Sequence, residues 1–129
     1  QANNSLGFPG ILKGALTVRA KKITDNMAIR AAESLAKYAE KKGISTEYII
    51  PTMDEFDVFP HEAADVAMQA IADGVARKKL SREEVYEIAK KDIEYSRALA
   101  DNMQKTGFIN EPDQELLQNA LNDAIQAVK

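Results

Sequence analysis

One stretch near the start of the chain decides how it folds: Asn3-Asn4-Ser5-Leu6-Gly7-Phe8-Pro9-Gly10-Ile11-Leu12-Lys13-Gly14-Ala15-Leu16. Leu6 and Phe8 alternate with small residues, which predicts a short strand or extended segment over residues 1–10. Pro9-Gly10 then interrupts this pattern. The apolar residues that follow have helical spacing, so we expect a helix whose apolar side carries Ile11, Leu12, Ala15 and Leu16.

Two more helices are predicted in the middle of the chain. Thr24 is expected to cap a helix that ends at Gly43, and its apolar side carries Ala28, Ala31, Ala32, Leu35 and Ala39. Pro60 is expected to begin the next helix, whose buried positions are Ala64, Ala67, Met68, Ile71 and Val75. Between these helices, a short β-favouring run over residues 48–50 is followed by a surface loop over residues 52–59.

The last third of the chain is also predicted to be helical. Ser81 and Glu84 have the spacing of a capping box, which opens a helix that stops at Gly107. A final helix is expected from about residue 111 to 128, with Asn110 as its cap. The fold class that follows is mainly α with one or two short strands.

Composition limits what a chain of 129 residues can be. The apolar fraction is 45%, but 20 residues are Ala while Leu, Ile, Val and Phe together number 30, so the core is either thin or shared with another part. The absence of cysteine favours a reducing compartment, the cytoplasm. A net charge of -3 and the lack of a long apolar run argue against nucleic-acid and membrane partners.

The first residue adds one expectation about the origin of the chain. Position 1 is Gln, and no Met precedes Met27, so we expect the chain to be a trimmed or expressed piece of a longer product.

One group of side chains could in principle bind a divalent cation: Asp54, Glu55, Asp57, His61 and Glu62. The alternative is an exposed acidic loop in which Asp57 caps a helix, Glu62 occupies its first turn and His61 faces solvent. We favour the alternative, because the spacing matches none of the known ligand motifs. The glycines at positions 7, 10 and 14 likewise lack the spacing of a dinucleotide-binding loop.

Asn3 and Asn4 are candidates for a binding site. Two adjacent carboxamides offer donors and acceptors that orient a carboxylate or a carboxamide without exchanging protons. Loop asparagines that form local turns are the alternative.

These residues resemble those of a known family. The opening stretch, together with Val18-Arg19-Ala20, is similar to the NN-x-x-x-FPG-x-x-x-GAL-x-x-RA segment of short, prokaryotic-type malic enzymes, or malate oxidoreductases. The likeness continues in order over about residues 1–79, through Ile23-Thr24, Ala31-Ala32-Glu33-Ser34-Leu35-Ala36, Tyr48-Ile49-Ile50-Pro51 and Gly74-Val75-Ala76-Arg77. Between Pro51 and Pro60 the chain departs from the family's P-F-D-x-R-V pattern and lacks the arginine of that pattern. No role of this arginine is therefore carried over to the chain.

The resemblance implies an activity. Such enzymes oxidise (S)-malate with NAD or NADP and decarboxylate the product to pyruvate and CO2, with a divalent metal, Mg or Mn, and a lysine and a tyrosine that move protons. Asn3 and Asn4 match the asparagine pair that orients malate, with a nicotinamide contact as a further expectation. The catalytic Tyr and Lys, the metal ligands and the dinucleotide loop would precede Asn3, so none is expected in this chain.

The resemblance also implies an organisation. Residues 1–79 would form the end of a Rossmann-like NAD(P)-binding domain, and residues 80–129 a C-terminal helical tail that packs on the substrate domain or a partner subunit. The expected partners are malate or pyruvate, the upstream part of the same enzyme and a second copy in a homodimer. The alternative is an independent helical protein-interaction module without catalysis, whose Ala-rich sides dock partner helices.

Overall fold

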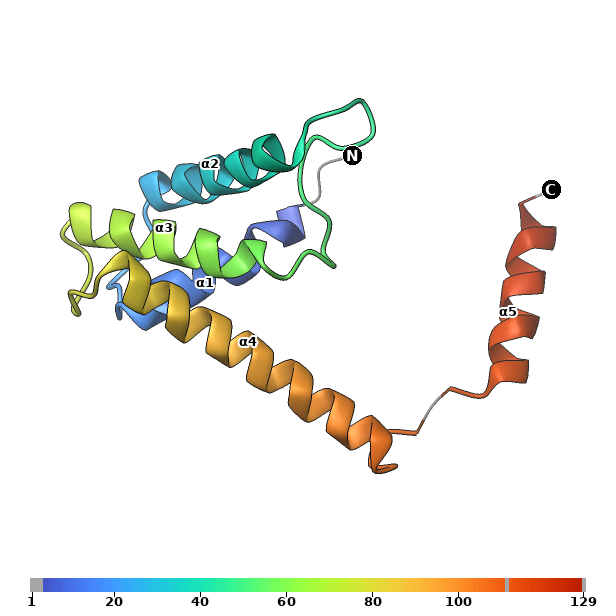
Figure 1. Cartoon of the computed structure of the whole chain (residues 1–129). Helices are drawn as coiled ribbons and strands as arrows, with labels where there is room; N and C mark the ends of the chain where they lie inside the picture. Colours follow the sequence, from blue (N-terminus) through green and yellow to red (C-terminus); the bar gives the residue numbers. More distant parts are fainter. Residues whose placement is uncertain (1–3, 111, 129) are drawn as a thin grey trace. The chain divides into compact units, whose positions relative to one another are not determined.

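The computed structural model describes residues 4–110 and 112–128, and this part of the chain is mainly helical, as predicted (Figure 1). Its elements are a short 3-10 helix, η1 (Asn4–Leu6), and five α-helices, which are α1 (Phe8–Thr17), α2 (Asp25–Lys42), α3 (Val58–Ala72), α4 (Arg82–Lys105) and α5 (Gln114–Ala127). The chain divides into two compact units, Gln1–Glu94 and Tyr95–Lys129. The functional boundary expected after residue 79 stays a prediction.

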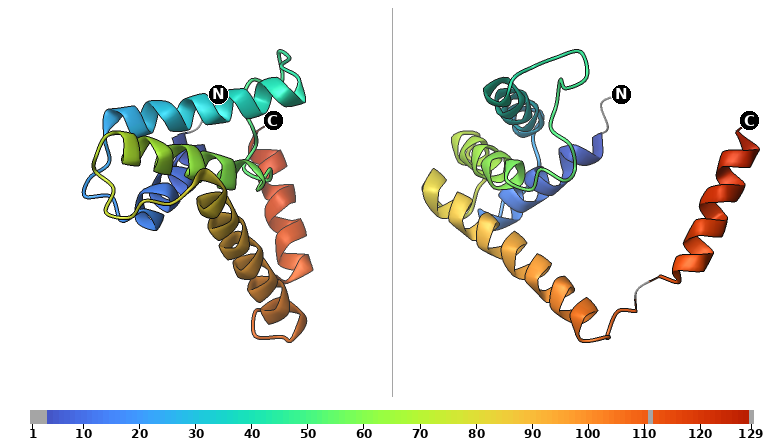
Figure 2. Two further views of the ribbon diagram at one scale, coloured as in Figure 1. Left: turned by 60° about the vertical axis from the view of Figure 1, so that its left-hand side comes forward. Right: turned by 45° about the vertical axis from the view of Figure 1, so that its right-hand side comes forward.

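The first unit is built around α3. This helix packs on both α1 and α2, and the three lie side by side in each view (Figures 1 and 2). Its contact surface consists largely of alanines, with Ala63, Ala64, Ala67 and Ala70 all fully buried. Small residues let neighbouring helices approach closely, so a core poor in large side chains is still well packed.

The strand predicted over residues 1–10 is not present in the described part of that stretch. Residues 4–6 form η1, and α1 already begins at Phe8, because a proline in the first turn of a helix needs no hydrogen bond partner for its nitrogen. The expected apolar side of α1 is only partly correct: Ala15 is buried and Ile11 is half-buried, but Leu12 and Leu16 are 42% and 73% exposed. The glycine side of α1 faces α3 instead.

Helix α2 begins and ends where the sequence predicts. The Thr24 hydroxyl accepts a hydrogen bond from the Met27 nitrogen at 3.2 Å, and Gly43 ends the helix with a φ of 108°. The predicted buried side is only partly correct. Ala31 and Ala39 are buried and Leu35 is half-buried, but Ala28 and Ala32 are exposed, and Met27 and Ser34 are buried instead.

The short strand predicted over residues 48–50 is also absent. Of its residues, Tyr48 forms an isolated bridge with Ser45, which precedes the predicted strand. Polar contacts to Glu55 replace a sheet: the Tyr48 hydroxyl donates to its carboxylate at 3.0 Å and the Thr52 nitrogen at 2.7 Å. Hydrogen bonds to the Glu55 carboxylate therefore stabilise this loop, which forms no sheet.

Helix α3 begins two residues earlier than predicted, at Val58, and Pro60 lies in its first turn. Asp57 occupies the cap position, but its side chain makes no capping hydrogen bond. Of the expected buried positions, Ala64, Ala67 and Val75 are buried, while Met68 and Ile71 are only partly buried.

The capping box of α4 is confirmed. The Ser81 nitrogen donates to Glu84 Oε2 at 2.7 Å, and the Glu84 nitrogen donates to the Ser81 hydroxyl at 3.2 Å. The expected start of α5 is wrong, because Asp113 and not Asn110 caps it, accepting from the Glu115 nitrogen at 2.9 Å.

Helix α5 has no buried residue, and its exposed apolar side chains include Leu116, Leu117, Leu121 and Ile125. Helix α5 therefore buries no apolar side within the described part of the chain. Among the described helices, none combines the length and the apolar character that crossing a membrane requires.

Candidate functional site

The predicted site begins at the first described residue. Asn3 lies outside the described residues, and Asn4 is exposed at the start of η1. The Asn4 carbonyl accepts a hydrogen bond from the Gly7 nitrogen at 3.2 Å. Two features of Asn4 follow: its backbone is fixed by a tight turn, and its side chain remains accessible.

A pocket of about 410 Å³ lies directly beside this turn. Ser5 and Leu6 form one side, and the loop that follows α2 forms the other, through Thr46, Glu47, Ile49, Ile50, Pro51, Thr52 and Met53. The Ser5 hydroxyl lies 3.8 Å from the Met53 sulfur. The structure thus brings Ser5 and Leu6 together with residues 49–51, and the family resemblance covers both of these segments.

Leu6 holds the turn over residues 4–7 in place through hydrophobic packing. Its side chain is 3% exposed and packs in a cluster with Val58 and Phe59, which begin α3, and with partly buried Leu35 and Ile50. The turn that carries Asn4 is therefore positioned by α3 through packing, while Asn4 itself stays exposed.

Glu62 is the functional candidate that the sequence interpretation placed wrongly. It is 0% exposed, and neither carboxyl oxygen has a hydrogen-bond partner among the described residues. Burial raises its pKa to about 8, and the nearby Gly10 N–H opposes this shift without reaching hydrogen-bond geometry. Its spacing of four residues from buried Val58 and Val66 is the signal that could have shown its burial.

The acidic group proposed as a possible metal site is dispersed in the structure. Glu55 binds Lys42, Tyr48 and Thr52; burial raises its pKa, but these partners together hold it below its usual value. Glu62 faces α1. Across residues 4–110 and 112–128, no group of three or more His, Asp or Glu side chains could hold a metal ion.

His61 is half-buried, and not solvent-facing as expected. Its ring lies 4.8 Å from that of Tyr86, centroid to centroid. Burial, and then the charges of Arg82 and Lys41, lower its pKa. A neutral imidazole packed on an aromatic ring fits a structural role.

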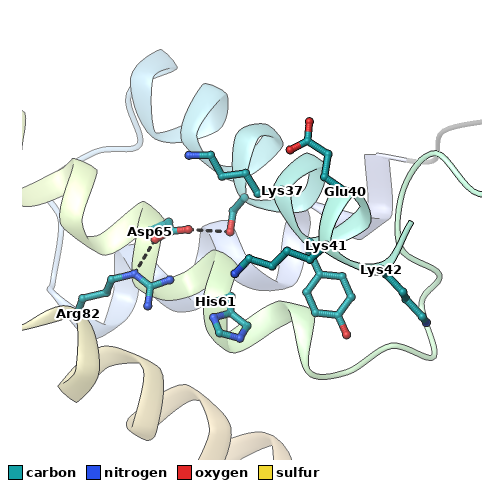
Figure 3. A pocket seen from close by; sticks show the side chains of 9 residues that line it. Lys37, Glu40, Lys41, Lys42, His61, Asp65 and Arg82 are labelled. Carbon is teal, nitrogen blue, oxygen red and sulfur yellow. Dashed lines mark hydrogen bonds and ion pairs between the residues drawn. The ribbon is translucent and has the colours of Figure 1, made fainter. Parts of the chain in front are cut away.

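A second pocket, of about 570 Å³, lies between α2, α3 and the first turn of α4 (Figure 3). Asp65 lines this pocket and accepts two hydrogen bonds there: the Ser34 hydroxyl donates to Oδ2 at 2.8 Å, and the Arg82 Nε donates to Oδ1 at 2.9 Å. Figure 3 shows Lys41 extending from α2 toward His61. These hydrogen bonds link α2, α3 and α4, so they stabilise the packing of the first unit.

Known proteins share this arrangement of residues. Residues 1–73 match the family model described as "Malic enzyme, NAD binding domain". The chain belongs to the malic enzyme family. Among curated malic enzymes, the bifunctional malic/malolactic enzyme of Bacillus subtilis is 43% identical over 91 residues, which are 70% of this chain and 22% of that protein. The NADP-dependent malic enzyme of Rhizobium meliloti is 37% identical over 100 residues, which are 67% of this chain and 13% of that protein.

Solved malic enzyme structures extend the likeness. The crystal structure of Entamoeba histolytica malic enzyme matches with a TM-score of 0.94 and 57% identity, covering 98% of this chain and 26% of that one. The crystal structure of malic enzyme from Pyrococcus horikoshii Ot3 matches with a TM-score of 0.74 and 43% identity, covering 81% of this chain and 24% of that one. The chain therefore spans about a quarter of the malic enzymes whose structures it matches.

Proposed function

We propose that this chain acts as the C-terminal part of an NAD(P)-dependent malic enzyme, which oxidatively decarboxylates (S)-malate to pyruvate and CO2 and reduces NAD or NADP. The observation that carries the proposal is the match of residues 1–73 to the malic enzyme NAD-binding domain. Its relatives include enzymes named for dependence on NAD and on NADP, which supports this class of cofactor.

Asn4 would orient the substrate. Asn4 is exposed and directly precedes Ser5, which lines the pocket, and its amide offers two donors and an acceptor to a carboxylate or a carboxamide. Holding malate in line with the nicotinamide ring raises turnover, because hydride transfer requires close alignment of donor and acceptor. Asn3 would complete the pair.

The residues described here do not themselves fit a bound metal or the phosphates of a dinucleotide. The described residues contain no group of three or more His, Asp or Glu side chains that could hold a metal ion, and Gly10 and Gly14 are used in packing α1 against α3. The metal ion and the dinucleotide loop would therefore belong to another part of the enzyme. Residues 1–79 would complete its Rossmann-like domain, and residues 80–129 would pack on the substrate domain or on the second subunit of a homodimer. The cytoplasmic location stays a prediction.

The test is steady-state kinetics of the enzyme that contains this chain. With Asn4→Ala, we expect kcat/KM for malate to fall by about 10-fold to 100-fold while the KM for the dinucleotide changes little. Asn26→Ala is the matched control, because Asn26 is an exposed amide on α2 that donates to Asp73 at the end of α3 and does not line the pocket beside Asn4. Unchanged malate kinetics in Asn4→Ala would return Asn4 to a turn-forming role, and a wild-type enzyme without malate activity would contradict the proposed function.

The exposed apolar side chains of α5 favour a second candidate, the helical interaction module. This candidate requires the chain alone to be a cooperatively folded monomer. Sedimentation and thermal unfolding at several concentrations separate the two candidates, because a midpoint that depends on concentration contradicts the module.

A further inference from the structure

We propose that Glu62 is a positioning residue for malate. Its buried carboxyl group packs against the first turn of α1 and so fixes the position of the turn that presents Asn4. This inference rests on the proposed function, because it assigns Glu62 a task in the same site. Glu62 touches neither the substrate pocket nor solvent, so it would act through the backbone of residues 4–10.

The first step is the contact between Glu62 and Gly10. A Cβ atom at position 10 would lie 2.2 Å from both the Glu62 Cδ and Oε2 atoms. Such a distance is far below van der Waals contact, so the carboxyl group occupies the space that any larger residue at position 10 would need. The glycine and the glutamate are complementary in shape across the contact of α1 with α3.

The second step leads from the carboxyl group to Asn4. A Cβ atom at Gly7 would lie 3.6 Å from Glu62 Oε1 and 3.8 Å from the Asn4 carbonyl oxygen. The Gly7 nitrogen donates to that same carbonyl oxygen at 3.2 Å, which closes the turn. Glu62 thus lies against the residue that closes the Asn4 turn.

The third step concerns the proton. Within the described residues, no charged side chain contributes to the raised pKa of Glu62; burial causes it, and only the Gly10 N–H opposes it. A neutral carboxyl group is tolerated in this environment, whereas an unpaired carboxylate is strongly disfavoured. Deprotonation of Glu62 above a pH of about 8 would therefore weaken its packing against the first turn of α1.

Kinetics of the enzyme that carries this chain test the assignment. We expect Glu62→Ala to lower kcat/KM for malate about 10-fold or more, with the KM for the dinucleotide changed less than about twofold. Glu62→Gln, which keeps the shape and cannot ionise, should restore most of this loss and shift or remove an alkaline decline in kcat/KM near pH 8. Val66→Ala is the matched control, because it weakens the same helix contact without touching the Asn4 turn.

Three results would overturn the assignment. The first is an equal loss of kcat/KM for malate in Glu62→Ala and Val66→Ala. The second is no recovery of kcat/KM with Glu62→Gln. The third is an alkaline decline in kcat/KM that Glu62→Gln leaves unchanged.

A second experiment uses the 129-residue chain and measures thermal unfolding of Gly10→Ala, Glu62→Ala and the double variant. The loss of stability in Gly10→Ala should be largely relieved when Glu62 is alanine. Gly14→Ala is the control: its Cβ would meet the Ala63 backbone at 2.5 Å, so Glu62→Ala should not relieve it. Additive effects of Gly10→Ala and Glu62→Ala would overturn the contact.

The two experiments also separate this inference from the proposed function. A wild-type enzyme without malate activity would contradict the function, while the double-variant cycle would still report the contact. Malate activity that is indifferent to Glu62 would contradict the positioning role alone.

Discussion

Gly14 lies against the backbone of Ala63, so that a methyl group on Gly14 would be 2.5 Å from the Ala63 carbonyl oxygen and 3.0 Å from the Val66 side chain. Helices α1 and α3 therefore meet backbone to backbone at this point. The distance between them is set by the absence of a side chain.

Gly14→Ala is expected to destabilise the chain. The clash with backbone atoms can be relieved only by separating the helices, which should cost roughly 1–3 kcal/mol and outweigh the gain in helix propensity of about 1 kcal/mol. Chemical denaturation measures the difference. Gly7→Ala is the control, since its new methyl group would make only ordinary contacts of 3.6 Å or more. Equal stability of the two variants would contradict the close approach.

The stability of the chain should depend on pH through Glu62. Its pKa is about 8 in the folded state against 4.5 as the ordinary value, so the folded state binds the proton more tightly. This contribution is fully present below about pH 4.5 and is lost as the pH rises toward 8, by up to roughly 1.4 kcal/mol per pH unit.

The measurement for Glu62 is the difference in the free energy of unfolding between the wild type and Glu62→Gln from pH 5 to 9. Because other carboxylates titrate equally in both proteins, the difference isolates Glu62. We expect the wild type to lose stability relative to Glu62→Gln as the pH rises. A constant difference would show that Glu62 ionises normally.

Thr24 joins the start of α2 to the end of α3. Its hydroxyl donates to Asp73 Oδ2 at 2.6 Å and accepts from the Met27 nitrogen at 3.2 Å. Thr24→Ala removes the cap and should cost about 1–2 kcal/mol. The hydrogen bond from Thr24 is the main cause that holds the pKa of Asp73 below its usual value, so this pKa should rise in the variant.

NMR titration of Asp73 checks this prediction, with Thr24→Ser as the conservative control. The serine variant keeps the hydroxyl and should leave the Asp73 pKa low. If Asp73 titrated alike in all three proteins, the assigned hydrogen bond would be wrong.

His61 should remain neutral at pH 7. Burial, followed by the charges of Arg82 and Lys41, lowers its pKa below 6.5, so its contribution to stability decreases as the pH falls below that value. NMR titration of the single histidine measures this pKa directly. Lys41→Gln should raise it, and a wild-type pKa above 6.5 would contradict the half-buried position of the ring against Tyr86.

Substitutions in α5 should hardly change the stability of the chain alone. Because α5 has no buried residue, Leu121→Ala should change the free energy of unfolding by about 0.5 kcal/mol or less. Val66→Ala, at a fully buried position, should cost about 1 kcal/mol or more. A comparable loss in Leu121→Ala would show that α5 is packed within the chain.

The sequence was informative wherever a helix end depends on local chemistry. Thr24, Gly43, Ser81 and Glu84 act within three or four residues of their own position, so their roles followed from spacing alone. Asp113 displaced Asn110 as a cap, since two caps of similar strength stood close together.

Tertiary contacts could not be predicted in the same way. Apolar periodicity placed Leu12 and Leu16 inside, because it gives no weight to glycine, whereas α1 packs through Gly10 and Gly14. Glu62 was expected in the first turn of a helix that follows an exposed acidic loop, because an acid is favourable there. Of the candidate site, Asn4 and its turn were identified, but the supporting glutamate depended on a neighbour 52 positions away in the sequence.

A side chain at position 10 would overlap the Glu62 carboxyl group, which constrains how the two positions can evolve. A lineage that keeps the glutamate is held to glycine at position 10. A lineage that first shortens residue 62 is free to accept alanine there, and the reverse order passes through an unstable intermediate. Paired substitution at these two positions, in that order, is the pattern of descent that this contact allows.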